Sequence, residues 1–442
     1  MDIKTIGIIE SPLLIHIINH LYYFKMKKLI TFLNLAAFIS TGVLYAGTYS
    51  GGNGDVSNPY QIATLDDLIE LSATPADHGA HFIQTLDIDA AASSSLNNGD
   101  GFAPIGKIGV PLFFGNYNGN GKIISNLTIN RPSEDNIGLF GYVNGATISD
   151  IHLKEASITG NNYVGSIVGN LWNGANVRQS SVTDGSVTGK QRVGGIIGNI
   201  AAEAANASTT MIHKSYSTAS VNGNDFVGGL AGYSTGRIEK CYAMSATVIA
   251  TGGGVGGLVG QIDGTATISE CYAAGGTVTG APGYSGGAIG FASAGIPTSN
   301  IEKLYWNTER TSQLTSAGGE GKTTNEMLQQ ATYVGWDFSE TWKFAANRNF
   351  NHPILYWQNE TLLPTTNLTT IYQGRNIYPT YANDLFYIRS DKAGQISIFD
   401  IYGNTVKNAV IHTGENCIDI SHLPTGIYLV TAHTTTAKII KR

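Results

Sequence analysis

Short apolar blocks recur through the middle of the chain, and each block ends on a glycine. Six copies occur, at Ile137–Gly141, Val164–Gly169, Val193–Gly198, Val227–Gly232, Val255–Gly260 and Ser285–Gly290. Successive closing glycines are 28, 29, 34, 28 and 30 residues apart. A nearly fixed period of this length is typical of repeat proteins, in which each unit buries its apolar side against its neighbours.

Two further strand-like pieces separate these blocks. One carries a serine or cysteine followed by tyrosine, and the other is a short Thr/Ser/Val run; examples are Met211–Ser217, Arg237–Ala243, Thr267–Ala273, Ser186–Gly189 and Thr277–Gly280. Three short strands per 29 or so residues predict one coil of a right-handed parallel β-helix, each coil adding about 4.8 Å. A β-propeller needs roughly 40 residues and four strands per repeat. We therefore expect Val164, Val193, Val227 and Val255 to align in one column.

The segments on either side of the repeats extend the same pattern. Phe82–Asp89 and Lys122–Ile129 alternate like strands, and Thr64–Ser72 predicts a helix with Thr64 as its N-cap. The sequence thus predicts an N-terminal cap with the first coils over 47–136, the repeats over 137–300, and an exit or capping segment over 301–360. A linker over 361–374 then leads to a final module over 375–442.

Residues 1–46 comprise an N-terminal extension up to residue 25 and, from Met26, a segment with the layout of a secretory signal peptide. Met26-Lys27-Lys28 is cationic, an apolar stretch runs from Leu29 to Leu44, and cleavage is expected between Ala46 and Gly47. The stretch is shorter than the roughly 20 residues of a membrane-spanning helix. Translation starts at either Met1 or Met26, and the sequence leaves this open.

Composition agrees with an extended β protein. Only 13% of residues are charged, 55 are glycines, and the net charge of -6 includes no basic run in the repeats that suggests nucleic acid. The three cysteines lack zinc-site spacing. Cys241 and Cys271 share one repeat position, so we expect them to lie above one another as buried thiols rather than a disulfide, with Cys417 pairing with neither.

The repeat blocks resemble the GLUG repeat of bacterial surface proteins. Further ordered motifs resemble that family's entry and exit segments: Asn58–Ile62, Pro104–Gly106, Gly119–Gly121, Tyr305–Thr308 and Gly335–Phe338. GLUG repeats are found in some adhesins and beside the catalytic domain of some IgA-specific metallopeptidases. The resemblance implies a surface-exposed protein, and this chain contains no HExxH peptidase motif.

The C-terminal module resembles the type A sorting domain of the type IX secretion system of Bacteroidetes. The resemblance rests on ordered motifs at Asn376–Pro379, Leu385–Ile388, Ile396–Gly403, Ile418–Tyr428 and Lys438–Arg442. Alternating strands at short spacing predict a small β-sandwich here. The resemblance implies that the type IX machinery is a partner, and that the chain passes through the periplasm to the outer surface or the medium.

Several candidate sites are weak on inspection. Gly321-Lys322-Thr323 lacks the first glycine of a phosphate-binding loop. His78 and His81 lack a third metal ligand, and we expect both to be exposed in a loop. Gly51–Asp55 is a single imperfect copy of a calcium-binding repeat, and we expect it to be a flexible linker. We predict no catalytic, cofactor or metal residues.

Two groups of residues leave alternatives open. The acidic residues Asp184, Asp225, Glu239, Asp263 and Glu270 sit at different repeat offsets, which argues against the clustered carboxylates of a sugar-cleaving β-helix. The tyrosines Tyr216, Tyr242, Tyr272 and Tyr305 form either an inward core ladder, which we favour, or an outward stripe for ligands. The leading hypothesis is a non-enzymatic surface protein that binds a glycan or a host or matrix protein. A carbohydrate-active enzyme and a structural spacer are the alternatives.

Overall fold

The structure, a computed structural model, consists of two compact units divided between Gln358 and Asn359. It describes residues 47–358, except 110, 282 and 346–347, and residues 377–441, except 379–380, 383–384, 391, 401–403 and 433–434. The predicted leader up to Ala46 and the predicted linker over 361–374 lie outside the described residues.

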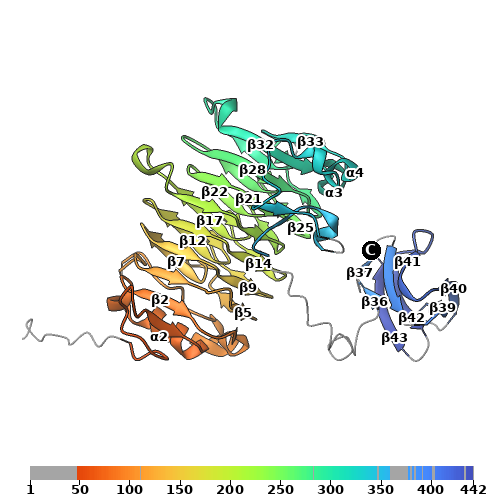
Figure 1. Ribbon diagram of the computed structural model, residues 1–442, viewed down its shortest axis with the longest axis horizontal. Coiled ribbons are helices and arrows are strands. Elements are labelled where there is room, and N and C mark those ends of the chain that lie inside the picture. Colours follow the sequence, from red (N-terminus) through yellow and green to blue (C-terminus); the bar gives the residue numbers. More distant parts are fainter. Residues whose placement is uncertain are drawn as a thin grey trace, which may run out of the picture. The chain divides into compact units, whose positions relative to one another are not determined.

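The first unit is a stack of short parallel strands, seen as successive rungs in Figure 1. One sheet contains β7 Phe140–Asn144, β12 Val168–Trp172, β17 Ile197–Ala201, β22 Ala231–Ser234, β27 Val259–Ile262 and β31 Ile289–Ala292. A second contains β11 Asn162–Gly165, β16 Gln191–Gly194, β21 Asp225–Gly228, β26 Val255–Gly256 and β30 Ser285–Gly286. A third contains β6 Thr128–Asn130, β10 Ser157–Thr159, β15 Ser186–Thr188, β20 Ser220–Gly223, β25 Thr247–Ala250 and β29 Thr277–Thr279.

The largest sheet runs the length of the stack in two rows that merge at its C-terminal end. One row holds β1 Tyr60–Ile62, β2 His81–Gln84, β4 Asn116–Asn118, β8 Thr147–Ser149, β13 Asn176–Arg178, β18 Met211–His213 and β23 Arg237–Glu239. The other holds β3 Ile88–Asp89, β5 Ile123–Ser125, β9 His152–Lys154, β14 Ser181–Thr183, β19 Tyr216–Ser217 and β24 Tyr242–Ala243. They join in β28 Thr267–Ala273, which is followed by β32 Ile301–Asn307 and β33 Glu320–Lys322.

Each full coil has five short strands instead of the predicted three. One coil runs from β11 to β15 and the next from β16 to β20. The glycine-ended block forms two strands across a tight bend. The serine/cysteine–tyrosine piece also splits, because a residue with positive φ turns the backbone, such as Gln179 (φ 48°) or Lys214 (φ 47°).

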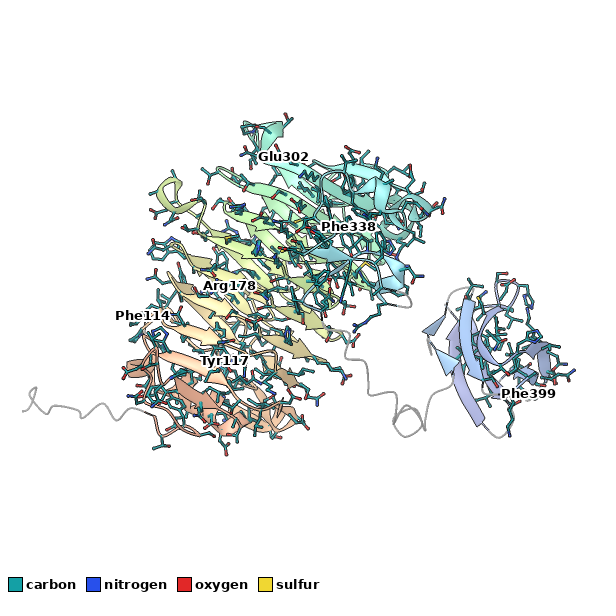
Figure 2. All side chains as sticks on the ribbon, in the orientation of Figure 1. Phe114, Tyr117, Arg178, Glu302, Phe338 and Phe399 are labelled. Atoms are coloured by element: carbon teal, nitrogen blue, oxygen red, sulfur yellow. The ribbon has the colours of Figure 1, made fainter. Side chains whose placement is uncertain are left out.

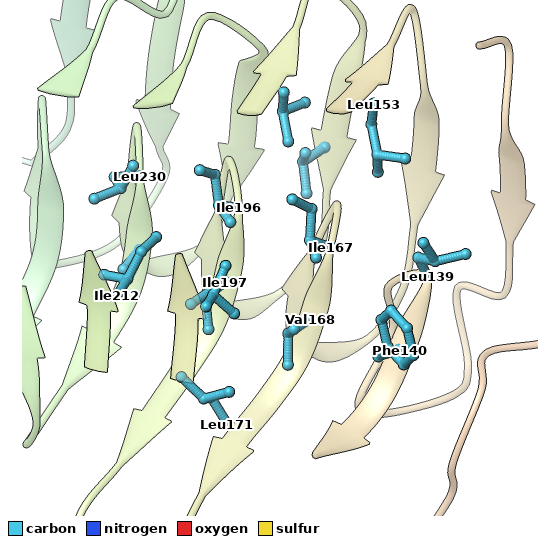
Figure 3. Packing of buried hydrophobic residues seen from close by; sticks show 14 of the residues in the cluster. Leu139, Phe140, Leu153, Ile167, Val168, Leu171, Ile196, Ile197, Ile212 and Leu230 are labelled. Atoms are coloured by element: carbon cyan, nitrogen blue, oxygen red, sulfur yellow. The ribbon is translucent and has the colours of Figure 1, made fainter. Parts of the chain in front are cut away.

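The predicted register is confirmed. Val164 pairs with Val193, Val193 with Val227, and Val227 with Val255. Alternate side chains point inward and form one continuous apolar core, in which Leu139, Ile167, Ile196 and Leu230 occupy successive rungs (Figure 3). The one long repeat, of 34 residues, accommodates its extra length in a surface loop around the 3₁₀ turn Ala204–Asn206 without shifting this register.

Glycine is required where the closing end of each block approaches the preceding coil. A Cβ added at Gly198 would lie 2.4 Å from the backbone N of Val164. No side chain fits at that separation, so the closing glycine follows from backbone packing.

The predicted N-terminal helix is confirmed as α2 Leu65–Ala73. Thr64 accepts from the backbone N–H of Asp67, and the Asp67 carboxylate accepts from the backbone N–H of Thr64, which completes a capping box. Leu68 and Leu71 bury the inner side of the helix against the first coils, near Tyr117, which is labelled in Figure 2.

The segment Gly51–Asp55 is packed, so the expectation of a flexible linker was wrong. Gly51 accepts a backbone hydrogen bond from Gln61, and Gly54 accepts one from His81. These bonds fix the segment against the first rung.

Cys241 and Cys271 lie in adjacent coils as buried free thiols, as predicted. The Cys271 sulfur lies 3.3 Å from the backbone N of Cys241. Ser215 occupies the same position in the ladder, and its hydroxyl likewise accepts from the backbone N–H of Ser180. Serine and cysteine therefore make the same contact with the preceding coil at this position. Cys417 lies in the other unit and is exposed.

The end of the first unit folds back along the outside of the solenoid. It contains α3 Thr308–Thr311, α4 Thr324–Met327, and the antiparallel pair β34 Trp342–Lys343 and β35 Ile354–Leu355. Phe338, labelled in Figure 2, belongs to this segment.

The second unit contains two mainly antiparallel sheets. One has β36 Ile377–Tyr378, β38 Leu385–Ser390 and β41 Gly414–Asp419. The other has β37 Tyr381–Ala382, β43 Thr435–Lys441, β42 Gly426–Ala432, β39 Gly394–Phe399 and β40 Thr405–Ile411. They share a small core that includes Phe386, Ile398 and Val430. No helix among the residues that the structure describes is long and apolar enough to span a membrane.

Candidate functional surface

The solenoid turns every outward repeat position into a column. Strand neighbours alternate between core and exterior, so in β24 Ala243 enters the core while Tyr242 points away from it. In-register pairing then places equivalent outward residues one above another. Two such columns are rich in aromatic residues.

The predicted tyrosines form the first column. Tyr216, Tyr242, Tyr272 and Tyr305 occupy consecutive rungs. The rings of Tyr216 and Tyr242 stack with centroids 4.7 Å apart, and those of Tyr242 and Tyr272 with centroids 5.0 Å apart. The column continues toward the N-terminus through Ser181 to His152.

Tyr242, Tyr272 and Tyr305 are buried and Tyr216 is partly buried, but not inside the coil, so the core-ladder interpretation was wrong in its location. They point outward, and residues 327–357 cover them in a second apolar cluster that includes Met327, Tyr333, Trp336, Trp342 and Leu355. We call residues 327–358 the strap. The strap closes this surface to ligands.

Specific polar contacts fix the strap to the column. The Tyr272 hydroxyl donates to the Pro353 carbonyl at 2.6 Å, and the Tyr242 hydroxyl donates to Gln358 Oε1 at 3.0 Å. Trp357 donates from its indole N–H to the Lys214 carbonyl, 2.8 Å away, and lies against the His152 ring with centroids 5.2 Å apart.

Burial between the strap and the solenoid holds these groups neutral. It raises the pKa values of the Tyr242 and Tyr272 hydroxyls well above their usual range. It also lowers the pKa of His352, whose ring stacks on Tyr272, to about 4, and that of His152 to about 4.

A second aromatic surface remains uncovered. Its rings come from two repeat positions, the residue after a closing glycine and the residue before the first residue of a block. We call these rings the aromatic stripe: Tyr142, Tyr163, Phe226, Tyr233, Tyr284 and Phe291. Tyr284 is 51% exposed and Phe291 39% exposed, with their rings 6.4 Å apart. Phe226 and Tyr233 meet edge to face at 6.3 Å.

Amide side chains form the floor of the aromatic stripe. Asn199 donates from Nδ2 to Asn170 Oδ1 at 2.9 Å, and Asn170 donates to Asn136 Oδ1 at 3.4 Å. All three side chains are buried. Such a hydrogen-bonded ladder holds the floor in one arrangement before any ligand arrives.

One cation joins the ladder to the rings. The Arg192 guanidinium lies over the Tyr233 ring at 4.1 Å and the Tyr163 ring at 5.2 Å, and it donates to Asn199 Oδ1 at 3.1 Å. The Tyr233 hydroxyl donates to the Asp263 carboxylate at 3.0 Å. The two charged side chains near the centre of the stripe, Arg192 and Asp263, thus both have partners within the protein.

The acidic residues considered from sequence lie on or after different strands, and Glu239 and Glu270 come from neighbouring rungs, since Glu239 pairs in register with Ser269. Asp225 belongs to β21, Glu239 to β23 and Glu270 to β28, while Asp184 and Asp263 follow β14 and β27. Glu239 accepts from Arg237 at 2.8 Å and also pairs with Lys240 and His213; the nearby cations lower its pKa against the opposing effect of burial. Glu270 lies 3.7 Å from Lys303.

The remaining candidates have structural contacts. His78 is fully buried, which corrects the expectation of an exposed loop, and its ring nitrogens face the carbonyls of Pro111 and Leu71. His81 contacts Asn116. Thr323, after Gly321-Lys322, caps the four-residue helix α4. Within 47–358 and the described part of 377–441, no three His, Cys, Asp or Glu side chains are grouped for a metal.

Gly47, on the mature side of the predicted cleavage, is the first described residue. Its backbone N–H donates to the Asp77 carboxylate at 2.7 Å, and the next N–H, of Thr48, donates to Glu70 at 2.7 Å. Two carboxylates therefore surround the point where an α-ammonium group would appear after cleavage.

Sequence reasoning missed the aromatic stripe. The available signal was the residue after each closing glycine, which reads Tyr142, Asn170, Asn199, Tyr233, Gln261 and Phe291. These residue types differ, so they did not stand out as a repeated motif, whereas the nearly uniform tyrosines did.

Comparison with known proteins identifies the second unit. Residues 376–442 match the family described as secretion system C-terminal sorting domain. This confirms the predicted sorting domain and indicates that the chain is exported.

Two further proteins match parts of the chain. The chain is 41% identical over 121 residues to Halomucin of Haloquadratum walsbyi, and 32% identical over 159 residues to a "Putative Gly-rich membrane protein" of Evansella cellulosilytica. These matches take 27% and 33% of this chain but span only 1% and 18% of those two proteins.

A solved structure shares the architecture. It is the crystal structure of a "putative immunoglobulin A1 protease" from Bacteroides ovatus, with 25% sequence identity and a TM-score of 0.54. The likeness covers 71% of this chain and 96% of that one.

Proposed function

We propose that this chain is a non-enzymatic surface protein of a Bacteroidetes-type bacterium, in which a GLUG-type solenoid displays a ligand-binding face for adhesion outside the cell. One observation carries the proposal. The chain joins a secretion sorting domain to a solenoid, and the strap covers one aromatic column of that solenoid but leaves the aromatic stripe uncovered. A spacer has no need of an uncovered, preorganised aromatic surface.

The acidic residues support a binding role over a hydrolytic one. A glycosidase needs a general acid with a raised pKa near a second carboxylate. Here Glu239 and Glu270 are engaged with cations, and Asp263 accepts from a tyrosine. Asp150, whose pKa burial raises, faces Arg178 in place of a second acid.

The test uses the bacterium that produces the chain. Removing residues 375–442 is expected to leave a folded solenoid in the periplasm, with none at the surface or in the medium, and to reduce attachment of cells to polysaccharide- or matrix-coated surfaces. A matched strain carrying Tyr356→Ala, an exposed strap position, should export and attach normally. Surface delivery of the truncated chain, or unchanged attachment without any surface protein, would contradict the proposal.

A further inference from the structure

We infer that the aromatic stripe is a binding surface for a neutral polysaccharide, an inference that rests on the proposed function and names its ligand class and site. Six rings lie along one outward face of the solenoid and remain partly or largely exposed, with two intervening coils that present Arg192 and Asn199, or Gly254 and Gln261, in their place. The other aromatic column of the same solenoid is covered by the strap.

One amide of the stripe has an unused hydrogen-bond acceptor. Gln261 is 8% exposed and lies in register between Tyr233 and Phe291. Its Nε2 donates to Ser293 Oγ at 3.1 Å, but its Oε1 accepts no hydrogen bond from any side chain or backbone group of the described residues. An unpaired buried acceptor costs free energy, and a ligand hydroxyl would remove that cost.

A glycine interrupts the row of rings at this level. Gly254 occupies the position that Phe226 fills in the preceding coil and Tyr284 in the following one. A Cβ at Gly254 would already lie 2.9 Å from Phe226 Cδ1. Two rings thus stand on either side of a glycine, in the same region as the Gln261 acceptor.

These groups match the chemistry of a sugar chain. The C–H faces of a pyranose ring pack on aromatic rings, and its equatorial hydroxyls pair with amides, which both donate and accept. Rings that recur along the stripe, with amides on the coils between them, offer an extended chain several such contacts.

The charges of the stripe favour a neutral ligand. Arg192 is engaged by two rings and Asn199, and Asp263 by the Tyr233 hydroxyl. A sulfated or uronate polymer would find no cation without a partner among these central residues of the stripe. A protein ligand would require a broader patch than this row of rings.

The test measures binding of the purified exported chain to immobilised amylose, mannan, xylan and β-glucan, with alginate, heparin, collagen and fibronectin as other ligand classes. The variants are Tyr233→Ala, Phe291→Ala and Gln261→Met. The control is Tyr356→Ala, which removes a ring that is 49% exposed in the strap. Circular dichroism confirms folding, and Phe291, at the exposed edge, keeps the test valid if Tyr233→Ala lowers stability.

We expect at least one neutral polysaccharide to bind, each ring removal to weaken that binding by about tenfold, and Tyr356→Ala to leave it unchanged. Equal binding by the parent and the stripe variants would overturn the site. Binding confined to collagen, fibronectin or an acidic polymer would overturn the ligand class while the proposed function stands. Absence of binding to every neutral polymer would also overturn the inference, and the cell-attachment assay decides separately whether the proposed function fails.

Discussion

Two histidines at the contact between the strap and the solenoid, the buried His352 and the partly buried His152, lead us to expect that mild acid destabilises the solenoid unit. His352 is fully buried, with its Nε2 3.4 Å from Asn307 Nδ2 and its Nδ1 3.2 Å from the Phe350 carbonyl. This arrangement suits a neutral ring that accepts at Nε2 and donates at Nδ1. His152 lies against Trp357, and burial lowers the pKa of both histidines from 6.5 to about 4.

The sign and size of the effect follow from proton linkage. Well above pH 6.5 both histidines are neutral in the folded and in the unfolded chain, so they cost no stability. Between pH 6.5 and 4 the unfolded chain binds more protons, so the free energy of unfolding falls as the pH falls, and it levels off below the folded pKa. At pH 5 each histidine accounts for a loss of about 2 kcal/mol, or about 4 kcal/mol for the pair. Most unfolded carboxyl groups titrate nearer pH 4 and contribute little above pH 5.

Denaturant unfolding at pH 7.5 and pH 5.0, followed by tryptophan fluorescence, measures this loss. Three of the five tryptophans, Trp336, Trp342 and Trp357, lie in or against the strap cluster and report its opening. The double variant His152→Gln/His352→Gln should lose far less stability between the two pH values than the parent, with a residual from His213, whose pKa burial also lowers. His422→Gln, an exposed position in the second unit, is the control. If the double variant and the parent lose equal free energy, the histidines do not carry the effect.

Three further predictions concern the coil, the thiols and the N-terminus. Gly198→Ala, whose Cβ would lie 2.4 Å from a backbone nitrogen, should lower the free energy of unfolding measured in denaturant by on the order of 3 kcal/mol. Gly253→Ala, whose Cβ would lie 3.5 Å from its nearest neighbour, should lower it little, and equal losses would refute the packing argument. Thiol labelling should modify one cysteine, Cys417, in the native chain and three in denaturant without reductant, and a count of one in denaturant would instead reveal a disulfide. A chain that begins at Gly47 should be about 1 kcal/mol more stable than one retaining Ala46, because its α-ammonium pairs with Asp77, and Asp77→Asn should remove the difference.

The coil architecture was predictable because its causes are local and repeated. The closing glycines follow from backbone contact between coils, and the valine column follows from the apolar period. The sequence indicated three strands per coil, whereas the structure has five. The bends that divide these strands lie at single residues with positive φ that are not glycine, such as Gln179 and Lys240, so the sequence does not mark them. The handedness of the coil stays a prediction.

The functional surface was less predictable because covering it is a long-range event. Tyr272 and Trp342 are 70 residues apart, and nothing in the period-two pattern of β28 indicates that a later segment returns over it. Sequence reasoning therefore offered two fates for the tyrosines, the coil interior or an open stripe. The structure realises a third, an outward column buried under the strap.

The two columns differ in how uniform their residues are. The covered column carries four consecutive tyrosines, and the uncovered position reads Tyr142, Asn170, Asn199, Tyr233, Gln261 and Phe291. A cover that packs against every rung requires similar shapes at each level, since interiors are close-packed and tolerate little change in volume. An open surface imposes no such uniformity, and a ligand that is both apolar and hydroxylated favours rings mixed with amides. In this solenoid, the four stacked tyrosines lie under a segment from later in the chain, and we propose that the mixed aromatic–amide column is where the ligand binds.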